Sequence, residues 1–591
     1  MKTKLLIVSC ISLAISACNP GQPIDSAATG SDFAVKGFAA PMSESEFDAL
    51  APGEQYRIAN KLMSTLYKGV AVDAFFDLSA GLKSPVRKDQ ADTLSDIRMR
   101  LGQPLDTETR YRIDRLIEGD PDAVDVNGDP EPLEPRYAFN NNRPKQMPLA
   151  RITEYPLSKD MFSQWMALHL TNTILFSPAE EIDSADITDV QNLFRRLELA
   201  IKNDTSVRAI VSTHQRSVEN WRRFRSPEDN TREMIEIYLG LFDRDDDVPK
   251  ASQVCRDLYL TDEAAGYKLA YTDYPNDEPQ LVLGQYVLNC NDFYDLIASH
   301  PLLIPRVISV LVDYFFEGRS TEDRTQLVAS IAAGNPETFE EIFTAILFSR
   351  EYLMNTERAR SFEENFMATA ARLQWEARGD VFMGMTTGRG GSSRAEMAEM
   401  GWPTMSLKLG RLNGIPLDSL SFANYHKGFR ELLLLDKYRW GVPMGMIKPE
   451  SPWPEVPEAL DDNADDEERA QYREDLENYN ADLATLTPPE RALYDEALAE
   501  WNEEMLVYRR VEALDVDELV DYLFLSVAER KALNIERAGL IQIFDVNGYL
   551  KTIDDEKFVL PWHRDELARL VLDYLSRLPE IYYHKKANLG A

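Results

Sequence analysis

Apolar residues recur along most of the chain with a period near 3.6, the period of an α-helix. Residues 339–347 are typical, with apolar side chains at 339, 342, 343, 346 and 347. Many such segments follow a Ser, Thr or Asn that can cap a helix, with an acidic residue in the first turn. These starts are Ser43-Glu44-Ser45-Glu46, Ser177-Pro178, Ser226-Pro227, Asn335-Pro336 and Thr487-Pro488. The pattern predicts an all-α protein, a large array of many helices.

Strand-like alternation of apolar and polar residues is scarce. The best candidate is QLVLGQYVL at residues 280–288. The sequence therefore predicts a short β-hairpin at most.

Two heptad-spaced segments follow each other near the C-terminal end. Each has apolar residues at a 4-3-4-3 spacing, and a Thr-Pro-Pro turn separates them, which predicts a protruding antiparallel helical hairpin. Residues outside the apolar seam are strongly acidic. One reading is an arm that packs only on itself and the body, and the other is a docking arm for a basic or apolar partner surface. The seam residues are Tyr472, Leu476, Tyr479, Leu483 and Leu486, then Tyr494, Leu498, Trp501, Met505 and Tyr508.

The N-terminus has the features of a bacterial export signal. Two lysines precede a short apolar run, and Ile15-Ser16-Ala17 then places small residues before Cys18, as in a lipobox. We expect lipid on Cys18; a plain signal peptide cut near Ala17 is the alternative. Asn19 after the cysteine resembles lipoproteins sorted to the outer membrane. The predicted location is a bacterial outer membrane lipoprotein, on the periplasmic face or the cell surface.

Composition divides the rest of the chain into segments. We expect a signal peptide at 1–17, a flexible tether at 18–42 and a helical core domain at 43–440. A segment with five prolines at 441–465, a linker or an extended strap, leads to the acidic hairpin at 466–512, and helices at 513–591 pack on the core.

Charge limits the class of partner. The formal net charge is −35, and a chain this acidic is repelled by the phosphates of nucleic acids and by anionic lipid surfaces. Nucleic acid is therefore excluded as a partner, and contact with the membrane is expected through the lipid anchor.

Cysteine usage agrees with export. Cys10 leaves with the signal and Cys18 carries the lipid, so Cys255 and Cys290 remain. In an oxidising compartment these two form a disulfide, and reduced buried thiols are the alternative. No Cys-x-x-Cys-His motif is present, which excludes covalently attached haem.

Two acidic stretches resemble the start of a calcium loop, with oxygen ligands at alternate positions. Pro130 and Arg136 depart from that loop in the first stretch, and Val248 and Val254 in the second. We keep both as calcium candidates, with no other cofactor expected. The ligands would be Asp125, Asn127 and Asp129, and then Asp243, Asp245 and Asp247.

A helix predicted within residues 225–242 carries an unusual charge cluster. Glu228, Arg232 and Glu236 form two i,i+4 pairs, which stabilise an exposed helix by about 0.2–0.5 kcal/mol each. Glu233 has no such cation, and a carboxylate near an apolar stripe needs a partner or a raised pKa.

Several stretches, in this order, resemble a known bacterial family. They are MFSQWMALHL (161–170) with His169, PEDNTREMIEI (227–237) with Arg232, Glu233 and Glu236, TDYPNDEPQLVLGQ (272–285) with Asp273, IASHPLLIPRVISVLVDYFF (297–316), EEIFTAILFSREYL (340–353) and MGWPTMSLKLGRLN (400–413). Together they are similar to family 1800 of the bacterial domains of unknown function. Thr272 replaces the histidine of the family's His-Asp pair, and Asp229 replaces an asparagine.

The resemblance implies an exported, helical protein without an assigned activity. Family members are often encoded beside a secreted sulfatase-like family, which suggests an exported protein partner. No catalytic residues can be carried over, because none are established.

Two functions follow from these observations. The first is a lipid-anchored envelope scaffold or binding protein that holds an exported partner at the outer membrane. The alternative is an envelope enzyme or metal-dependent binding protein, with a carboxylate and histidine site between helices. That site would gather His169, Arg232, Glu233, Glu236 and Asp273.

Overall fold

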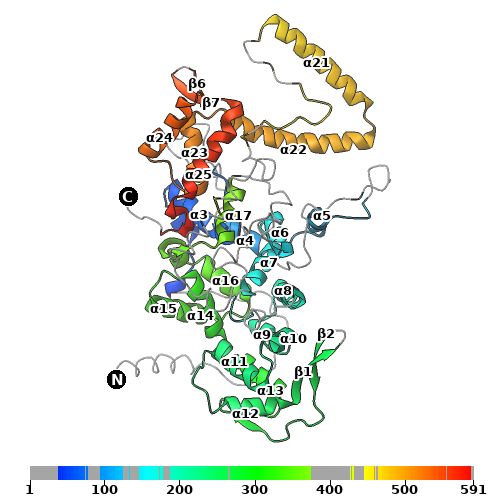
Figure 1. Ribbon diagram of the computed structural model, residues 1–591, viewed down its shortest axis with the longest axis vertical. Coiled ribbons are helices and arrows are strands. Elements are labelled where there is room, and N and C mark those ends of the chain that lie inside the picture. Colours follow the sequence, from blue (N-terminus) through cyan, green and yellow to red (C-terminus); the bar gives the residue numbers. More distant parts are fainter. Residues whose placement is uncertain are drawn as a thin grey trace. The chain divides into compact units, whose positions relative to one another are not determined.

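Helices dominate the structure, as the 3.6-residue period predicts (Figure 1). The computed structural model describes residues 37–72, 75–76, 94–123, 132, 146–171, 173–176, 187–263, 266–373, 426, 429–430, 445–446, 448–457, 460, 464–553 and 555–586. Its α-helices are α2 Glu44–Asp48, α3 Pro52–Thr65, α4 Leu94–Leu101, α5 Thr107–Glu118, α6 Gln146–Glu154, α7 Lys159–Leu170, α8 Ile187–Lys202, α9 Val207–Gln215, α10 Val218–Arg223, α11 Pro227–Leu239, α12 Val248–Val254, α13 Cys290–Ser299, α14 Leu303–Phe315, α15 Thr321–Ala332, α16 Phe339–Leu347, α17 Phe362–Arg372, α21 Asp466–Thr485, α22 Pro488–Glu512, α23 Val516–Ala528, α24 Asn534–Val546 and α25 Arg564–Ser576. The predicted signal peptide and the predicted lipid site at Cys18 lie outside the described residues.

The local start signals mostly place helix ends correctly. Ser43 caps α2 with a capping box to Glu46, and Ser226 caps α11 with Pro227 at its first position. Asn335, however, is not a cap: it adopts a positive φ of 52°, and the N-cap of α16 is Thr338, three residues later. Thr338 has the stronger signal, because Glu341 completes a capping box with it.

Within the described residues, strands occur only as small antiparallel pairs. The described residues form four two-stranded sheets, and the hairpin predicted at 280–288 is one of them. Two further hairpins add to the one that the sequence indicated, while β5 and β8 join segments far apart in the chain. The strands are β1 Leu258–Glu263 with β2 Gly266–Tyr271, β3 Gln280–Val282 with β4 Gln285–Val287, β5 Arg358–Ala359 with β8 Tyr583–His584, and β6 Leu550–Ile553 with β7 Glu556–Val559.

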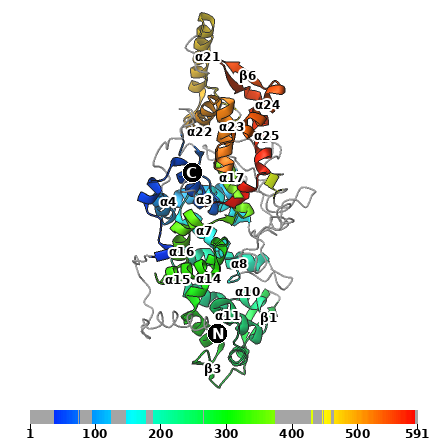
Figure 2. The same cartoon turned by 90° about the vertical axis from the view of Figure 1, so that its left-hand side faces the viewer.

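Helix α7 lies at the centre of the core. All of its residues from Asp160 to Leu170 are buried, and it packs against α4, α6, α8 and α16 (Figure 2). A helix that is buried on every side carries apolar residues all round, which agrees with the sequence MFSQWMALHL. In the same view α23 and α25 pack on each other and connect to the body through α17.

The last residues of the predicted tether are part of the folded structure. Residues 37–39 form a short 3-10 helix, and Ala39 is fully buried. The Met42 N–H donates to the Phe348 carbonyl at 2.9 Å, and the Arg350 N–H donates to the Ala40 carbonyl at 3.0 Å. These backbone bonds hold residues 40–42 against the end of α16, a long-range contact that composition alone does not reveal.

The two helices of the acidic hairpin are present, but they do not pack along the predicted seam. Together α21 and α22 are called the arm below. Tyr479 and Tyr494 share a hydrogen bond of 2.9 Å near the turn, and Figure 1 shows the two helices diverging beyond it.

A proline-rich segment occupies the seam of α22 instead. This strap comprises the described residues among 445–457. The Tyr494 hydroxyl donates to the Pro454 carbonyl at 3.2 Å, and the Trp501 indole donates to the Pro449 carbonyl at 3.4 Å. Gly445 lies so close to Val511 that a Cβ there would come within 2.6 Å of it. Of the two readings of this segment, a linker or an extended strap, the structure shows the strap, which runs antiparallel along α22.

The described chain contains no single helix that is both long and apolar enough to cross a membrane. Helices α13 and α14 reach that length and composition only when taken together, across a bend of 65°.

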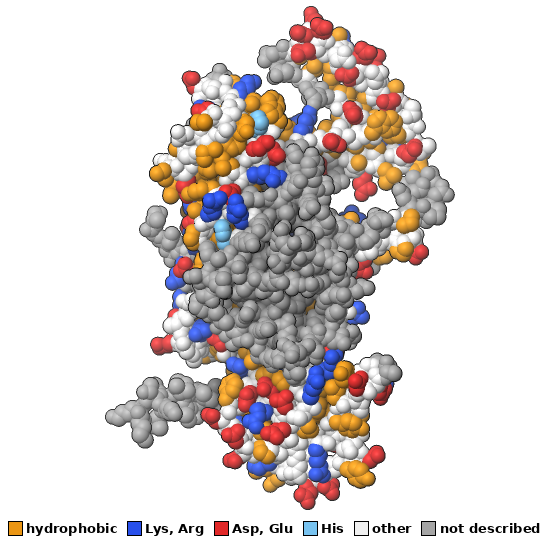
Figure 3. Space-filling model, in the orientation of Figure 1, with side chains coloured by type: hydrophobic (Ala, Val, Ile, Leu, Met, Phe, Trp, Pro, Cys, Tyr) orange, Lys and Arg blue, Asp and Glu red, His pale blue; other side chains and the backbone are white. Residues whose placement is uncertain are grey.

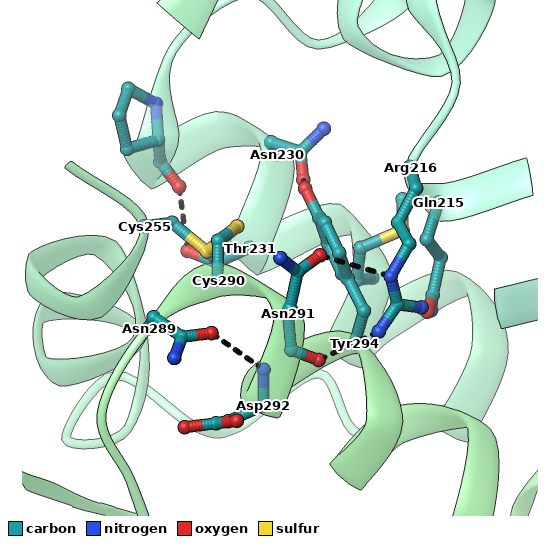
Figure 4. Close-up of a disulfide and its surroundings, with 12 residues drawn as sticks. Gln215, Arg216, Asn230, Thr231, Cys255, Asn289, Cys290, Asn291, Asp292 and Tyr294 are labelled. Atoms are coloured by element: carbon teal, nitrogen blue, oxygen red, sulfur yellow. Dashed lines mark hydrogen bonds between the residues drawn. A yellow bond between two sulfur atoms is a disulfide. The ribbon is translucent and has the colours of Figure 1, made fainter. Parts of the chain in front are cut away.

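The predicted disulfide is present. Cys255 follows α12 and Cys290 begins α13, and both are fully buried (Figure 4). Around it, the Tyr294 hydroxyl donates to Asn230 at 2.8 Å, which ties α13 to α11. The disulfide therefore fixes the base of a segment that contains β1 to β4.

We expect a Cys255→Ala, Cys290→Ala double variant to be less stable by about 3–4 kcal/mol. The disulfide closes a loop with a sequence separation of 35, and it restricts the unfolded chain accordingly. The measurement is thermal unfolding with and without dithiothreitol. Reductant should lower the melting temperature of the wild type and leave the double variant unchanged; equal melting temperatures in the absence of reductant would contradict the expectation.

Candidate functional site

His169 is a core residue rather than an accessible base. Its ring stacks on Trp165 and Phe315 with centroid distances of 5.4 and 5.1 Å, and it meets Tyr314 and Phe343 edge-on. Burial, followed by the charge of Arg358, lowers its pKa to about 3. A neutral imidazole among aromatic rings acts here as a packing group.

The charged side chains of α11 make their contacts at the protein surface. Arg232 lies 3.3 Å from Glu228 and 3.5 Å from Asp245, an exposed carboxylate. Glu233 and Glu236 are half-buried, while Asp273 is exposed after β2. Arg232 thus pairs with its own helix and the next loop, not with His169.

The metal-dependent version of the site has no support in the described ranges. No three His, Cys, Asp or Glu side chains there lie close enough to hold a metal ion together. His169, Glu233, Glu236 and Asp273 therefore do not converge as a metal site.

The carboxylates of the second calcium candidate, Asp243, Asp245 and Asp247, also do not form a metal site among the described residues. Asp247 accepts a bond from the Leu283 N–H at 3.0 Å, and Asp245 faces Arg232. Asp243 is exposed. The first candidate, Asp125, Asn127 and Asp129, lies outside the described residues.

The structure assembles a different polar group that sequence analysis missed. We call it the buried ionic cluster, and it joins α3, β5, α17, α23 and β8. Its members are Lys61, Arg358, Arg360, Glu364, Arg372, Glu529 and His584, all buried. Charged residues are almost never fully buried unless they are paired, so this cluster needs explanation.

Two carboxylates organise the cluster. Glu364 receives two bonds from Arg358, at 2.5 and 2.8 Å. Glu529 accepts from Arg360 at 2.6 Å and from Arg372 at 3.0 Å. Burial alone would raise the pKa of Glu529, but the two arginines outweigh it and hold that pKa below its usual range.

Glu529 also has an unusual backbone. It ends α23 with a φ of 57°, a left-handed conformation that costs energy for a residue with a Cβ. Glycine is the common choice at such a position, so a buried glutamate is selected here for its carboxylate. The sequence signal was weak, because Ala-Glu-Arg after an apolar helix reads as an ordinary exposed end.

The arm combines exposure to solvent with a strong negative charge. None of the residues of α21 is buried. Tyr472, Leu476, Tyr479 and Leu483 lie on one face of this helix, and Leu476 remains 38 % exposed. Figure 3 shows acidic side chains spread over the arm with apolar ones between them.

Comparison with family models, with curated proteins and with solved structures finds no match to this chain. The resemblance to family 1800 of the domains of unknown function therefore stays a prediction.

We expect a His169→Phe variant to fold and to be less sensitive to acid. In the unfolded chain the pKa of His169 returns to about 6.5, so the unfolded state binds one more proton between about pH 6.5 and 3. Stability therefore falls as the pH drops through this window, by up to about 1.4 kcal/mol per pH unit. Denaturant unfolding at several pH values measures the slope. An unchanged slope in the variant would show that His169 is not the group involved.

We expect Glu529→Gln to destabilise the protein by about 3–5 kcal/mol at neutral pH, because it leaves two buried arginines without their carboxylate. Because the pKa of Glu529 is lower in the folded than in the unfolded chain, the extra stability of the wild type is lost as the pH falls below about 4.5. Glu496→Gln, on the exposed surface of α22, is the matched control and should change stability by less than about 0.5 kcal/mol. Equal melting temperatures for the two variants would contradict the expectation.

Proposed function

We propose that this protein is a lipid-anchored envelope scaffold that holds an exported partner protein at the outer membrane through the arm. The partner surface that fits the arm is basic at its edge and apolar at its centre. The single observation that carries the proposal is the exposure of α21: none of its residues is buried, and Leu476 in its apolar stripe is 38 % exposed.

The apolar stripe of α21 is only partly covered by α22. The strap packs along the seam of α22 through Tyr494 and Trp501, and Tyr479 of α21 meets Tyr494 near the turn. A half-exposed stripe of tyrosine and leucine on a projecting helix is typical of a helix that binds in a groove. Tyrosine in particular suits interfaces, because it offers large contact area and a polar end.

The charge of α21 determines the kind of partner. Seven acidic side chains oppose two arginines, which gives a local net charge of −5. Such a surface raises the association rate with basic proteins and repels acidic ones, and salt weakens both effects. The acidic residues are Asp466, Glu467, Glu468, Glu474, Asp475, Glu477 and Asp482.

Other features support the same function. The expected lipid on Cys18 would keep the scaffold at the membrane, and the Gly, Pro and Ser content of residues 19–36 suits a tether. The resemblance to family 1800 makes a sulfatase-like exported protein the first partner to test.

The test uses a triple charge reversal on α21, Glu474→Lys, Glu477→Lys and Asp482→Lys. These side chains are exposed, so the fold should be unaffected. The matched control is Asp246→Lys, Asp262→Lys and Asp277→Lys, which changes the net charge by the same amount on exposed sites near β1 to β4. The lipidated wild type is first purified from native membranes in mild detergent, and the stoichiometric partner is identified by mass spectrometry and purified.

Binding of the purified partner is then measured by calorimetry at several salt concentrations. We expect the arm variant to bind at least tenfold more weakly and the control to stay within twofold of the wild type. The wild-type affinity should fall as salt rises. Native affinity in the arm variant, or affinity that does not depend on salt, would overturn the docking role of the arm.

A further inference from the structure

The buried ionic cluster contains more positive than negative charge. Lys61, Arg358, Arg360 and Arg372 face only Glu364 and Glu529 in the cluster. Glu351 is engaged by Arg319 at 2.9 Å and by Asn355, Glu317 is half-buried, and Glu357, beside Arg358, is exposed. Among the fully buried groups, four cationic side chains therefore face two carboxylates, and an uncompensated buried charge is very costly.

Lys61 shows the effect of this surplus. It is 2 % exposed, and its ammonium donates to the Thr356 carbonyl at 2.6 Å and lies 5.0 Å from the centre of the Tyr352 ring. Burial, and then the charge of Arg358, lowers its pKa well below the usual range of a lysine. Neither a carbonyl nor a ring supplies the negative charge that a buried ammonium requires.

Two further side chains have unused polar atoms in the same place. Arg360 is 2 % exposed and His584 is 1 % exposed. Within the described part of the chain, Arg360 Nη1 and both ring nitrogens of His584 have no hydrogen-bond partner. Buried polar atoms are rarely left in this state, and an unobserved ion or water is the usual explanation.

Strand pairing brings these groups to one spot. In the β5–β8 pair His584 is directly opposite Arg358, and the Arg360 N–H donates to the Tyr582 carbonyl at 2.9 Å. Because side chains alternate along a strand, Arg358, Arg360 and His584 share one face, with diagonal neighbours about 7–8 Å apart. His584 Nε2 also lies 3.9 Å from Glu364, the partner of Arg358.

We propose that a small oxyanion, such as phosphate or sulfate, binds in this cluster between Arg360 and His584. It would accept hydrogen bonds from Arg360 Nη1 and from one ring N–H of His584, and its charge would offset the surplus that Lys61 and the arginines create. Water could fill the unused hydrogen bonds, but it would leave the charge unbalanced, and this favours an anion. The site is independent of the arm and of the function proposed for it.

The test uses the full mature chain. Protein dialysed exhaustively against chloride-free buffer is denatured in acid, and the released anions are measured by ion chromatography. We expect about one equivalent of phosphate or sulfate per chain. Where dialysis removes it, added inorganic phosphate should raise the melting temperature above that in potassium chloride of equal ionic strength, as binding to the folded state requires.

His584→Phe is the informative variant, because it keeps an aromatic ring and the arginine–carboxylate pairs of the cluster while removing the ring N–H. We expect it to need at least tenfold more phosphate for the same rise in melting temperature. His214→Phe replaces another buried histidine and should respond like the wild type. Arg360→Met should lose the response entirely, but it also breaks the bond to Glu529, so it is secondary.

Three outcomes would overturn the proposal. One is a wild type that releases no oxyanion and whose melting temperature is the same in phosphate and in chloride, which would mean that water fills the site. Another is a response to chloride alone, which would assign the site to a halide. The third is an equal phosphate response in wild type and His584→Phe, which would place the anion elsewhere.

Discussion

The interaction on which the rest of the structure depends is the pairing of Glu529 with Arg360 and Arg372. A buried carboxylate is tolerable only when its partners are in place, and here the partners come from β5 and α17. Glu529 itself ends α23 in a left-handed conformation that directs the chain toward these arginines. The C-terminal helices can therefore pack on the core only in one arrangement, because any displacement would leave three charged groups buried and unpaired.

Buried polar contacts also join β8, near the C-terminus, and α3, near the N-terminus, to the segment around β5. β8 pairs with β5, and this brings His584 to the face of Arg358, while Lys61 reaches the same region from α3. A purely apolar junction would bind these segments equally well and specify their register less. The surplus of positive charge is then a consequence of joining four segments in one buried space, and it is this surplus that calls for an anion.

The arm presents the opposite situation. Its charge is negative and faces solvent, where water and salt reduce the cost of like charges. The strap contacts the apolar side of α22, so the stripe of α21 is only partly covered. Two charged regions of one chain thus differ because of burial: the inner one fixes the packing of segments, and the outer one is the surface for which we propose a partner.

Local sequence determined much of the fold. The caps at Ser43 and Ser226, the apolar period at 339–347 and the hairpin at 280–288 depend on residues within a few positions of one another, so they can be recognised without the tertiary structure. The disulfide also followed from the sequence, because only two cysteines lie outside the predicted signal and lipid site. The sequence did not show which charged residues would be buried. Arg360 and Glu529 are 169 residues apart, and the sequence around each is that of an exposed segment. His169 became a packing residue, and α22 took the strap rather than α21 as its neighbour, for the same reason: which side chains meet across the core depends on the sum of many long-range contacts, whereas helix ends and periods depend on neighbours in the chain.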